Sequence, residues 1–199
     1  MKVFRPIARS CQGYVATALA LALLLAVTRR TLEQSMALHM LLQFPVLVLI
    51  GMMLTGQVPL TWQARAARWN AYGITGLAFV AIISALGMVP RLLDLALVDM
   101  RIEILKCAVL VLCGMALRLS WRRAGIVVQL FFLGNVLPMM AISGSLYVDT
   151  PQRLCNAYRL DEQLWVGQAL IGVAAGLGAM WLGRVGWQYS RQDSAGLHA

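Results

Sequence analysis

The chain has 199 residues, of which 60% are hydrophobic and only 13% are charged. A soluble domain usually carries about 25% charged residues and could not bury this much apolar surface, so the composition excludes an ordinary soluble protein and favours membrane-spanning helices. The net charge of +9 does not indicate a nucleic-acid-binding protein, because the Lys and Arg residues lie in short segments between apolar runs.

We predict an all-α fold: a polytopic transmembrane bundle of about six helices that forms a single membrane-embedded domain over residues 1–199. A helix needs roughly 20 apolar residues to cross a hydrocarbon core of about 30 Å. The sequence contains no sustained period-two alternation, which would indicate strands. The predicted helices cover approximately residues 12–28, 35–56, 71–89, 104–119, 124–143 and 163–182.

The first run could be a cleaved signal peptide, and the second contains a proline. The first follows a basic N-terminal segment, which is also the profile of a signal peptide. Because Arg29-Arg30 follows this run without a small-residue cleavage site, we favour an uncleaved helix. Pro45 lies near the middle of the second run and is expected to kink it, because proline removes one helix hydrogen bond.

Polar segments separate the later runs. The segment Gln57–Asn70 contains Trp62, Trp69 and two arginines, and we expect it at the membrane interface, because Trp and Arg favour the headgroup level. We expect a more polar stretch, Arg91–Lys106, around the start of the fourth helix and a long loop, Gly144–Glu162, before the sixth. A polar tail is expected after the sixth helix.

Small residues at four-residue spacing predict close helix packing. Gly172 and Gly176 have this spacing in the sixth run, and Ala18, Ala22 and Ala26 have it in the first. Such spacing lets two helix backbones approach each other closely in a membrane.

The distribution of basic residues predicts that both termini lie in the cytoplasm, because cytoplasmic loops carry an excess of Lys and Arg. For six helices, one side holds ten of the 17 basic residues: Lys2, Arg5, Arg9, Arg65, Arg68, Arg118, Arg122, Arg123, Arg184 and Arg191. The other side holds Arg29, Arg30, Arg91, Arg101, Lys106, Arg153 and Arg159.

Soft metal ligands gather in the predicted outer half of the second helix. Four residues share one face there: Met36, His39, Met40 and Gln43. Four further methionines lie at the same predicted level: Met88, Met100, Met139 and Met140. Thioether and imidazole ligands suit Cu(I), so His39, Met36, Met40 and Met88 form a candidate copper site, near the carboxylates of Asp94 and Glu103. The alternative is structural, since methionine also fills apolar cores.

No motif indicates an enzyme. The sequence lacks a Gly-rich phosphate loop and a zinc-peptidase histidine pair, and the only other histidine is His198 in the tail. Cys107 and Cys113 are expected on different faces of one helix and Cys155 alone in a loop, so no disulfide is predicted. We therefore predict that the chain is not an enzyme.

Three segments share an order and spacing with a known family. They are Ser35-Met36-Ala37-Leu38-His39-Met40-Leu41-Leu42, then Met88-Val89-Pro90-Arg91-Leu92-Leu93-Asp94-Leu95-Ala96-Leu97, and Ser145-Leu146-Tyr147 followed by Asp161-Glu162-Gln163 and Gly167. They resemble, in order, the His-Met-x-Gln-His-Met, Trp-His-x-Pro-x-Leu-x-Asp-x-Ala and Leu-Tyr-Pro … Asp-Gln-x-x-Gly elements of the CtaG family of cytochrome c oxidase assembly factors.

The chain departs from the family at its histidines. Ser35 and Val89 stand where the family has histidine, and the histidines expected near the start of the next helix fall around Arg101 and Lys106. His39 alone remains of the set. The family also has one more helix and a longer chain.

The resemblance implies a membrane-embedded assembly factor for cytochrome c oxidase in a bacterial inner membrane, with oxidase subunits as partners, that handles Cu(I) at the periplasmic face. Two alternatives stay open. One is a metal-free membrane scaffold or chaperone. The other is a small transporter whose path is lined by Gln43, Gln129, Asn135, Arg101 and Glu103. The lipid bilayer is a partner in each case, and no nucleic acid is expected.

Overall fold

The computed structural model describes residues 5–152, 154 and 158–196, and the regular structure of these residues is entirely helical, as predicted. The elements are α1 (Arg5–Val27), α2 (Arg29–Glu33), the π-helix η1 (Leu38–Gln43), α3 (Phe44–Leu54), the 3-10 turn η2 (Thr55–Gln57), α4 (Leu60–Trp69), the 3-10 turn η3 (Ala71–Gly73), α5 (Ile74–Gly87), α6 (Pro90–Val98), α7 (Met100–Trp121), α8 (Ile126–Asp149) and α9 (Leu160–Gly196).

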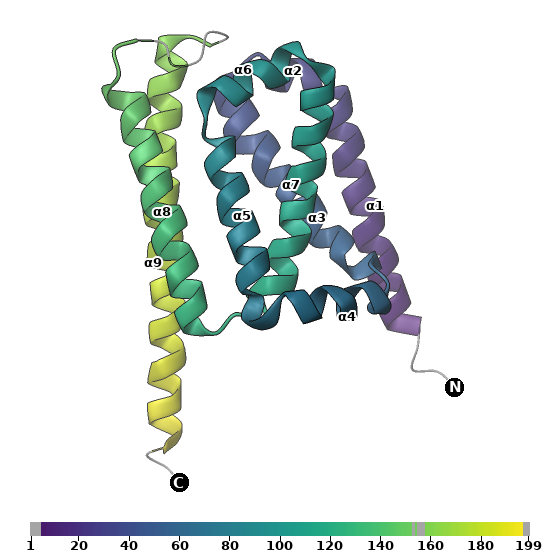
Figure 1. Ribbon diagram of the computed structural model, residues 1–199. Helices are drawn as coiled ribbons and strands as arrows, with labels where there is room; N and C mark the ends of the chain where they lie inside the picture. Colours follow the sequence, from purple (N-terminus) through teal and green to yellow (C-terminus); the bar gives the residue numbers. More distant parts are fainter. Residues whose placement is uncertain (1–4, 153, 155–157, 197–199) are drawn as a thin grey trace.

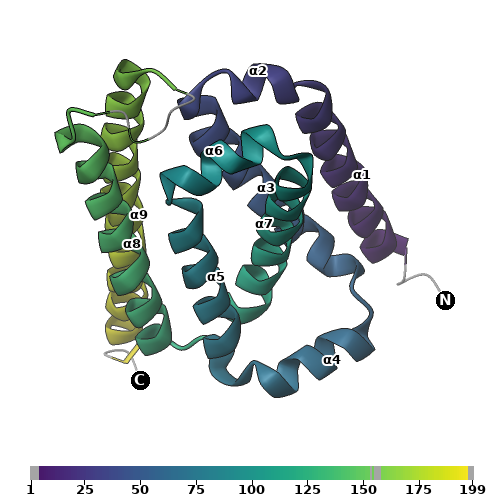
Figure 2. The ribbon, with the colours of Figure 1, turned by 45° about the horizontal axis from the view of Figure 1, so that its top comes forward.

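The long helices run roughly alongside one another. Helices α1, α3, α5 and α7 pack together, and α8 and α9 form a long hairpin beside α5 (Figures 1 and 2). The short helices α2 and α6 lie at one end of the bundle, and α4 crosses the opposite end (Figure 1). We call these the α6 end and the α4 end. Helix α1 begins and α9 ends toward the α4 end, so the two terminal helices start and finish on the same side.

Within the part of the chain that the structure describes, three helical stretches are long and apolar enough to cross a membrane: Leu38–Gln57, Ile126–Asp149 and Leu160–Arg191. The number is four if the bent pair Leu60–Trp69 and Ala71–Gly87 counts as one span. Many apolar side chains on these helices face outward, including Val127 and Phe131 of α8. Apolar helices with exposed apolar faces support a membrane-spanning protein.

A sharp bend separates α4 from α5. The two helices meet at 72°, and Tyr72 and Gly73 adopt positive φ angles of 55° and 76° at the corner. A Cβ at Gly73 would collide with the carbonyl oxygen of Ser120, so both the φ angle and the close approach require glycine. Asn70 secures the corner, because its side chain donates to Ser120 Oγ (2.8 Å) and accepts from Gly76 N (3.0 Å).

The second run does not simply kink at Pro45. Instead the chain forms the π-helix η1 just before it, and Pro45 lies in the first turn of α3. In a continuous helix proline cannot donate a hydrogen bond to the preceding turn, and its ring crowds the carbonyl there. The wider π turns therefore accommodate Pro45 within a continuous helical stretch from Leu38 to Gln57.

The polar stretch before the fourth predicted helix is itself helical. It forms α6 and the first turns of α7, which begins at Met100 rather than near residue 104. Asp99 ends α6 and caps α7, accepting a hydrogen bond from Arg101 N at 2.8 Å. An N-cap of this kind satisfies one of the unpaired N–H groups of the first turn and sets where the helix begins.

The predicted loop Gly144–Glu162 is much shorter than expected. Helix α8 runs on to Asp149 without interruption at Pro138, and α9 begins at Leu160 and continues to Gly196. The expected polar tail after residue 182 is therefore helical as well. Polarity alone does not end a helix. This segment has no proline, and its glycines at 183 and 186 weaken a helix without ending it.

The close helix contacts lie at different glycines from those predicted. Gly172 and Gly176 have open space where a Cβ would be, so this prediction is wrong. Helices α8 and α9 instead approach at Gly144 and Gly167, where a Cβ on either would lie 2.6 Å from the other's carbonyl oxygen. The second close crossing joins α3 and α7: a Cβ at Gly51 would collide with Val111 O, and one at Gly114 with Val48 O. In the first run, only Ala18 of the alanine series is buried.

Candidate functional site

Three of the four predicted ligand residues, Met36, His39 and Met40, lie inside the bundle near the α6 end, on and just before η1. His39 is completely buried (0% exposed), and Met40 and Gln43 of the same π-helix are buried as well. π-Helical turns are rare and are frequently found at functional sites. The surroundings of His39 are therefore the place to look for chemistry.

Both ring nitrogens of His39 have partners. Lys106 Nζ of α7 lies 2.9 Å from Nε2, and the Tyr158 hydroxyl, from the connection before α9, lies 3.0 Å from Nδ1. An ammonium group can only donate, so Nε2 accepts and the ring proton is on Nδ1, which donates to the tyrosine oxygen. His39 is thus a neutral imidazole that joins α7 to the α8–α9 connection.

Lys106 continues the chain of contacts to Glu103. Its Nζ lies 2.6 Å from Glu103 Oε2, one turn earlier on α7, and 5.4 Å from the centre of the Phe44 ring. Glu103 Oε1 accepts from Gln43 Nε2 at 3.4 Å and from Cys107 Sγ at 3.5 Å. The Glu103 and Lys106 side chains are 4% and 13% exposed, so the loss of solvation is offset mainly by these contacts.

We call this set the polar network. Its members are Tyr158, His39, Lys106, Glu103 and Gln43.

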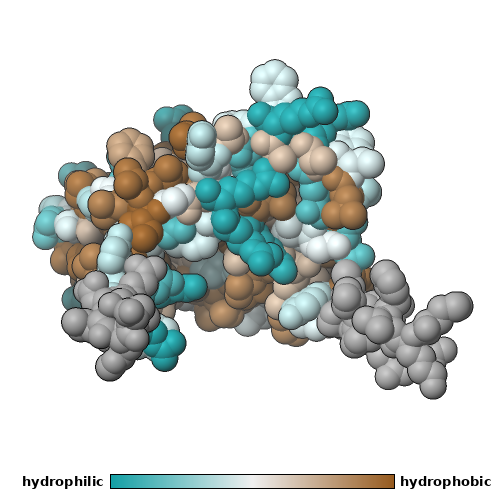
Figure 3. All heavy atoms as spheres, turned by 90° about the horizontal axis from the view of Figure 1, so that it is seen from below, coloured by the Kyte–Doolittle hydropathy of each residue, from teal (hydrophilic) through white to brown (hydrophobic). Residues whose placement is uncertain are grey.

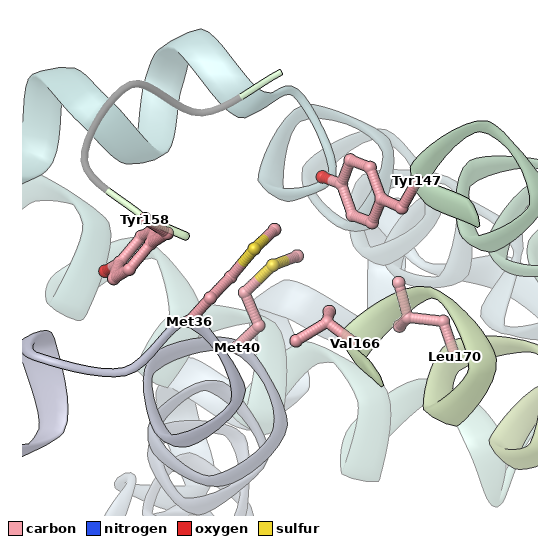
Figure 4. Close-up of a cluster of buried hydrophobic side chains, with 6 residues drawn as sticks. All are labelled: Met36, Met40, Tyr147, Tyr158, Val166 and Leu170. Carbon is pink, nitrogen blue, oxygen red and sulfur yellow. The ribbon is translucent and has the colours of Figure 1, made fainter. Parts of the chain in front are cut away.

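The two predicted thioether ligands lie together beside the network. Met36 and Met40 extend side by side in a buried apolar cluster (Figure 4). Tyr147 of α8 and Val166 and Leu170 of α9 complete its walls. The methionines therefore join the start of the second helix to the α8–α9 hairpin, which is the packing role that methionine commonly has.

The other methionines that were predicted at this level do not all lie together. Met88 contributes its carbonyl oxygen, which accepts from the Tyr147 hydroxyl at 3.0 Å, and its side chain is not among those packed in the cluster. Met140 packs against the cluster from α8. Met100 is exposed and its sulfur accepts from Arg29 at 2.8 Å. The structure thus brings together Met36, Met40 and Met140 but not the whole predicted set.

Arg29 adds a positive charge at the α6 end. Its Nε donates to Glu33 Oε1 at 2.5 Å, one turn later on α2. This hydrogen bond raises the pKa of the Arg29 guanidinium above its ordinary value, against the opposing effect of partial burial. Arg29 therefore stays protonated beside a site that already contains an ammonium group.

The three segments that resemble the CtaG family meet at this site. Glu162 accepts a hydrogen bond from Met36 N at 3.0 Å and so joins the third segment to the first. The Tyr147–Met88 bond joins the third segment to the second. Gln163 closes the third segment on itself, because its side-chain amide donates to Tyr147 O at 3.1 Å.

A Cu(I) ion on His39 would compete with the hydrogen bonds that both ring nitrogens already make. Copper would have to displace Lys106 from Nε2 or Tyr158 from Nδ1, and the nearby ammonium would repel the metal ion. Among the described residues, no group of three or more His, Cys, Asp or Glu side chains is placed to hold a metal. Copper binding by His39, Met36, Met40 and Met88 stays a prediction that rests on the sequence.

The residues expected to line a transport path lie apart. Gln43 and Glu103 belong to the polar network, whereas Gln129 bonds to Trp121 O and Ala124 O at the α4 end. Asn135 is exposed and donates to a carbonyl of its own helix. These side chains do not form one continuous polar route.

Two hydrogen-bond partners of His39, Lys106 and Tyr158, were not predicted from the sequence. Lys106 was not predicted to contact His39, although Glu103 and Lys106 at a three-residue spacing indicate an ion pair on one helix. Tyr158 has no sequence signal, because it lies in an irregular connection. Cys107 and Cys113 are free thiols, and Cys155 falls outside the described residues.

Comparison with known proteins gives no relative. No family model, no curated protein and no solved structure matches the chain. The interpretation of the site therefore rests on its own geometry and on the three segments.

Proposed function

We propose that this chain is a membrane-embedded assembly factor for cytochrome c oxidase that acts as a metal-free scaffold for oxidase subunits. The observation that carries the proposal is the meeting of the three CtaG-like segments at one end of the bundle. These segments are far apart in the sequence. The resemblance rests on their residues and spacing alone, so their contacts in the fold are an independent observation. A shared site is what a common functional element would require.

The polar network supports the metal-free form of this function. Lys106, which falls near a family histidine position, donates to the one histidine that remains. The Lys106 ammonium group donates a hydrogen bond to the His39 ring nitrogen, the position that a metal ion would occupy in a copper site. In this proposal the network fixes the shape of the α6 end, and oxidase subunits recognise that shape.

The proposal includes six membrane crossings, by α1, α3 with its π-helix, α5, α7, α8 and α9, in a bacterial inner membrane. Both termini then lie in the cytoplasm and the α6 end faces the periplasm. The common side on which α1 begins and α9 ends supports an even number of crossings (Figure 1). The excess of basic residues in the segments at the α4 end supports the orientation.

The test separates packing from metal chemistry at the same positions. In a strain that lacks the protein, oxidase activity and subunit content are measured after complementation with the native chain or with Met36→Leu/Met40→Leu. Leucine has a volume close to that of methionine but no sulfur, so a scaffold keeps its function. The matched control is Met36→Ala/Met40→Ala, which also removes the packing and is expected to lose function.

The experiment distinguishes three outcomes. Restored oxidase with the leucine variant and loss with the alanine variant support a scaffold. Loss with both variants, at normal protein levels, and Cu(I) bound by the purified native chain but not by the leucine variant would support copper handling instead. Normal oxidase in the strain without the protein would contradict an assembly role altogether.

A further inference from the structure

A polar cavity lies at the α4 end, on the opposite side of the molecule from the polar network. Its volume is about 400 Å³, and it opens between the end of α7, the start of α8 and the later turns of α9. Its lining includes two indoles, two guanidinium groups and two side-chain amides: Trp121, Trp181, Arg122, Arg184, Gln129 and Gln188.

The wall of this cavity is held by hydrogen bonds. Gln129 donates from its side-chain nitrogen to Trp121 O at 3.3 Å and to Ala124 O at 3.0 Å. Its side-chain oxygen accepts from Trp181 Nε1 at 3.1 Å. Gln129 therefore ties the α7–α8 connection to α9, and the cavity has a defined shape.

The cavity is strongly electropositive. Arg122 and Arg184 are exposed and form no ion pair with any other described residue. Of the eight acidic residues in the sequence, all but Asp193 lie in the short segments or helix ends nearest the α6 end. Hydrophilic side chains gather across the middle of this face (Figure 3). The two arginines thus have few negative charges nearby to screen them.

The start of α8 adds to this potential. Gly125 occupies its N-cap position, and no side chain caps the helix. The first N–H groups of a helix lack internal partners, and the helix dipole makes that end positive. Gly125 and Ile126 line the cavity, so the positive end of α8 lies beside it.

We propose that this cavity binds the phosphate headgroup of an anionic phospholipid. Guanidinium groups bind phosphate oxygens through paired, charge-assisted hydrogen bonds, and indoles favour the headgroup level of a membrane. Basic pockets between membrane helices bind anionic headgroups by the same chemistry. The apolar outer side chains Val127 and Phe131, in the next turns of α8, offer a surface for the acyl chains. This inference does not depend on the proposed function.

The test measures lipid binding to the purified full-length chain in a neutral detergent. Phosphatidylglycerol and phosphatidylcholine with identical acyl chains are titrated separately, and bound lipid is counted by native mass spectrometry. We expect tighter binding of phosphatidylglycerol. Arg122→Gln and Arg184→Gln are each expected to weaken it about five-fold, since a basic residue near anionic lipid contributes about 1 kcal/mol.

Arg123→Gln is the matched control, because Arg123 lies next to Arg122 and is exposed but does not line the cavity. It is expected to leave the affinity unchanged. Equal binding of the two lipids, or an equal loss in all three variants, would overturn the proposal. A separate arm adds inorganic phosphate, and binding of phosphate without selectivity for phosphatidylglycerol would also overturn it. All three side chains are exposed, so the variants are expected to fold, which size-exclusion chromatography checks.

Discussion

His39 is the residue on which the α6 end depends, because its two ring nitrogens connect different parts of the chain. The partner on α7 is 67 residues away in sequence and the partner before α9 is 119 residues away. Each bond therefore stabilises a contact between elements rather than a single helix. Within an apolar bundle such bonds have little competition from water, and an unpaired nitrogen there is costly.

The first prediction concerns the Tyr158 hydroxyl. Tyr158→Phe removes the group that pairs with His39 Nδ1 and leaves a buried polar atom without that partner. We expect the free energy of unfolding to fall by about 1–3 kcal/mol, measured by reversible unfolding in mixed micelles. Tyr189→Phe removes an exposed hydroxyl and is expected to change stability by less than about 0.5 kcal/mol. Equal effects of the two variants would contradict the assigned hydrogen bond.

The second prediction concerns the buried ion pair. Lys106→Met leaves the Glu103 carboxylate without its counter-ion, which is expected to cost about 3–5 kcal/mol of stability. The double variant Glu103→Gln/Lys106→Met removes both charges, and we expect it to be more stable than the single variant. A double-mutant cycle in the same unfolding assay measures the coupling. Additive effects would show that the two side chains do not interact.

Among the elements, two helix crossings determine the packing, and both depend on pairs of glycines. Helices α3 and α7 approach at Gly51 and Gly114, and α8 and α9 approach at Gly144 and Gly167. In each pair the backbone of one helix occupies the space that a Cβ on the other would need. The α3–α7 crossing places η1 against α7 and so brings His39 to Lys106.

The third prediction contrasts two glycines that both lie within apolar helices but differ in the space around them. Gly144→Ala is expected to destabilise the fold by about 1–3 kcal/mol, because the new methyl group would lie against Gly167 O. Gly172→Ala is expected to be neutral or to stabilise by up to about 1 kcal/mol, because its position is open and alanine favours a helix. Thermal unfolding of both variants in detergent tests the contrast, and a larger loss at Gly172 would contradict the observed crossing.

The apolar runs predicted where the long helices lie, because hydropathy and helix length are local properties of the sequence. Contacts between elements were not predictable in the same way. Gly172 and Gly176 match a packing motif, yet α9 turns Gly167 toward α8 instead. The candidate site shows the same limit. Its position at His39 follows from the rarity of histidine in an apolar run, whereas its partners Lys106 and Tyr158 depend on how distant segments meet.

Across the whole molecule, the charges divide between the two ends. The α6 end carries both acids and bases, which pair at Glu103–Lys106, Arg29–Glu33 and Arg159–Asp161. The α4 end is almost purely basic in sequence. Mixed charge suits a surface that recognises a protein, and unpaired basic charge suits an anionic membrane surface. The proposed partner site therefore lies at the end with mixed charge, and the proposed lipid site lies at the basic end.

The last prediction tests this polarity directly. Because the excess of basic residues favours the cytoplasmic side, a fluorescent protein fused after Gly196 is expected to fold and fluoresce in the cytoplasm, and alkaline phosphatase fused there is expected to be inactive. Alkaline phosphatase inserted after Pro151, in the connection between α8 and α9, is expected to be active because the α6 end then faces the periplasm. Activity of the phosphatase at both positions would contradict a crossing by α9. Activity after Gly196 and inactivity after Pro151 would reverse the orientation. The α4 end would then lie outside, and the excess of basic residues would fall on the side that the positive-inside rule disfavours.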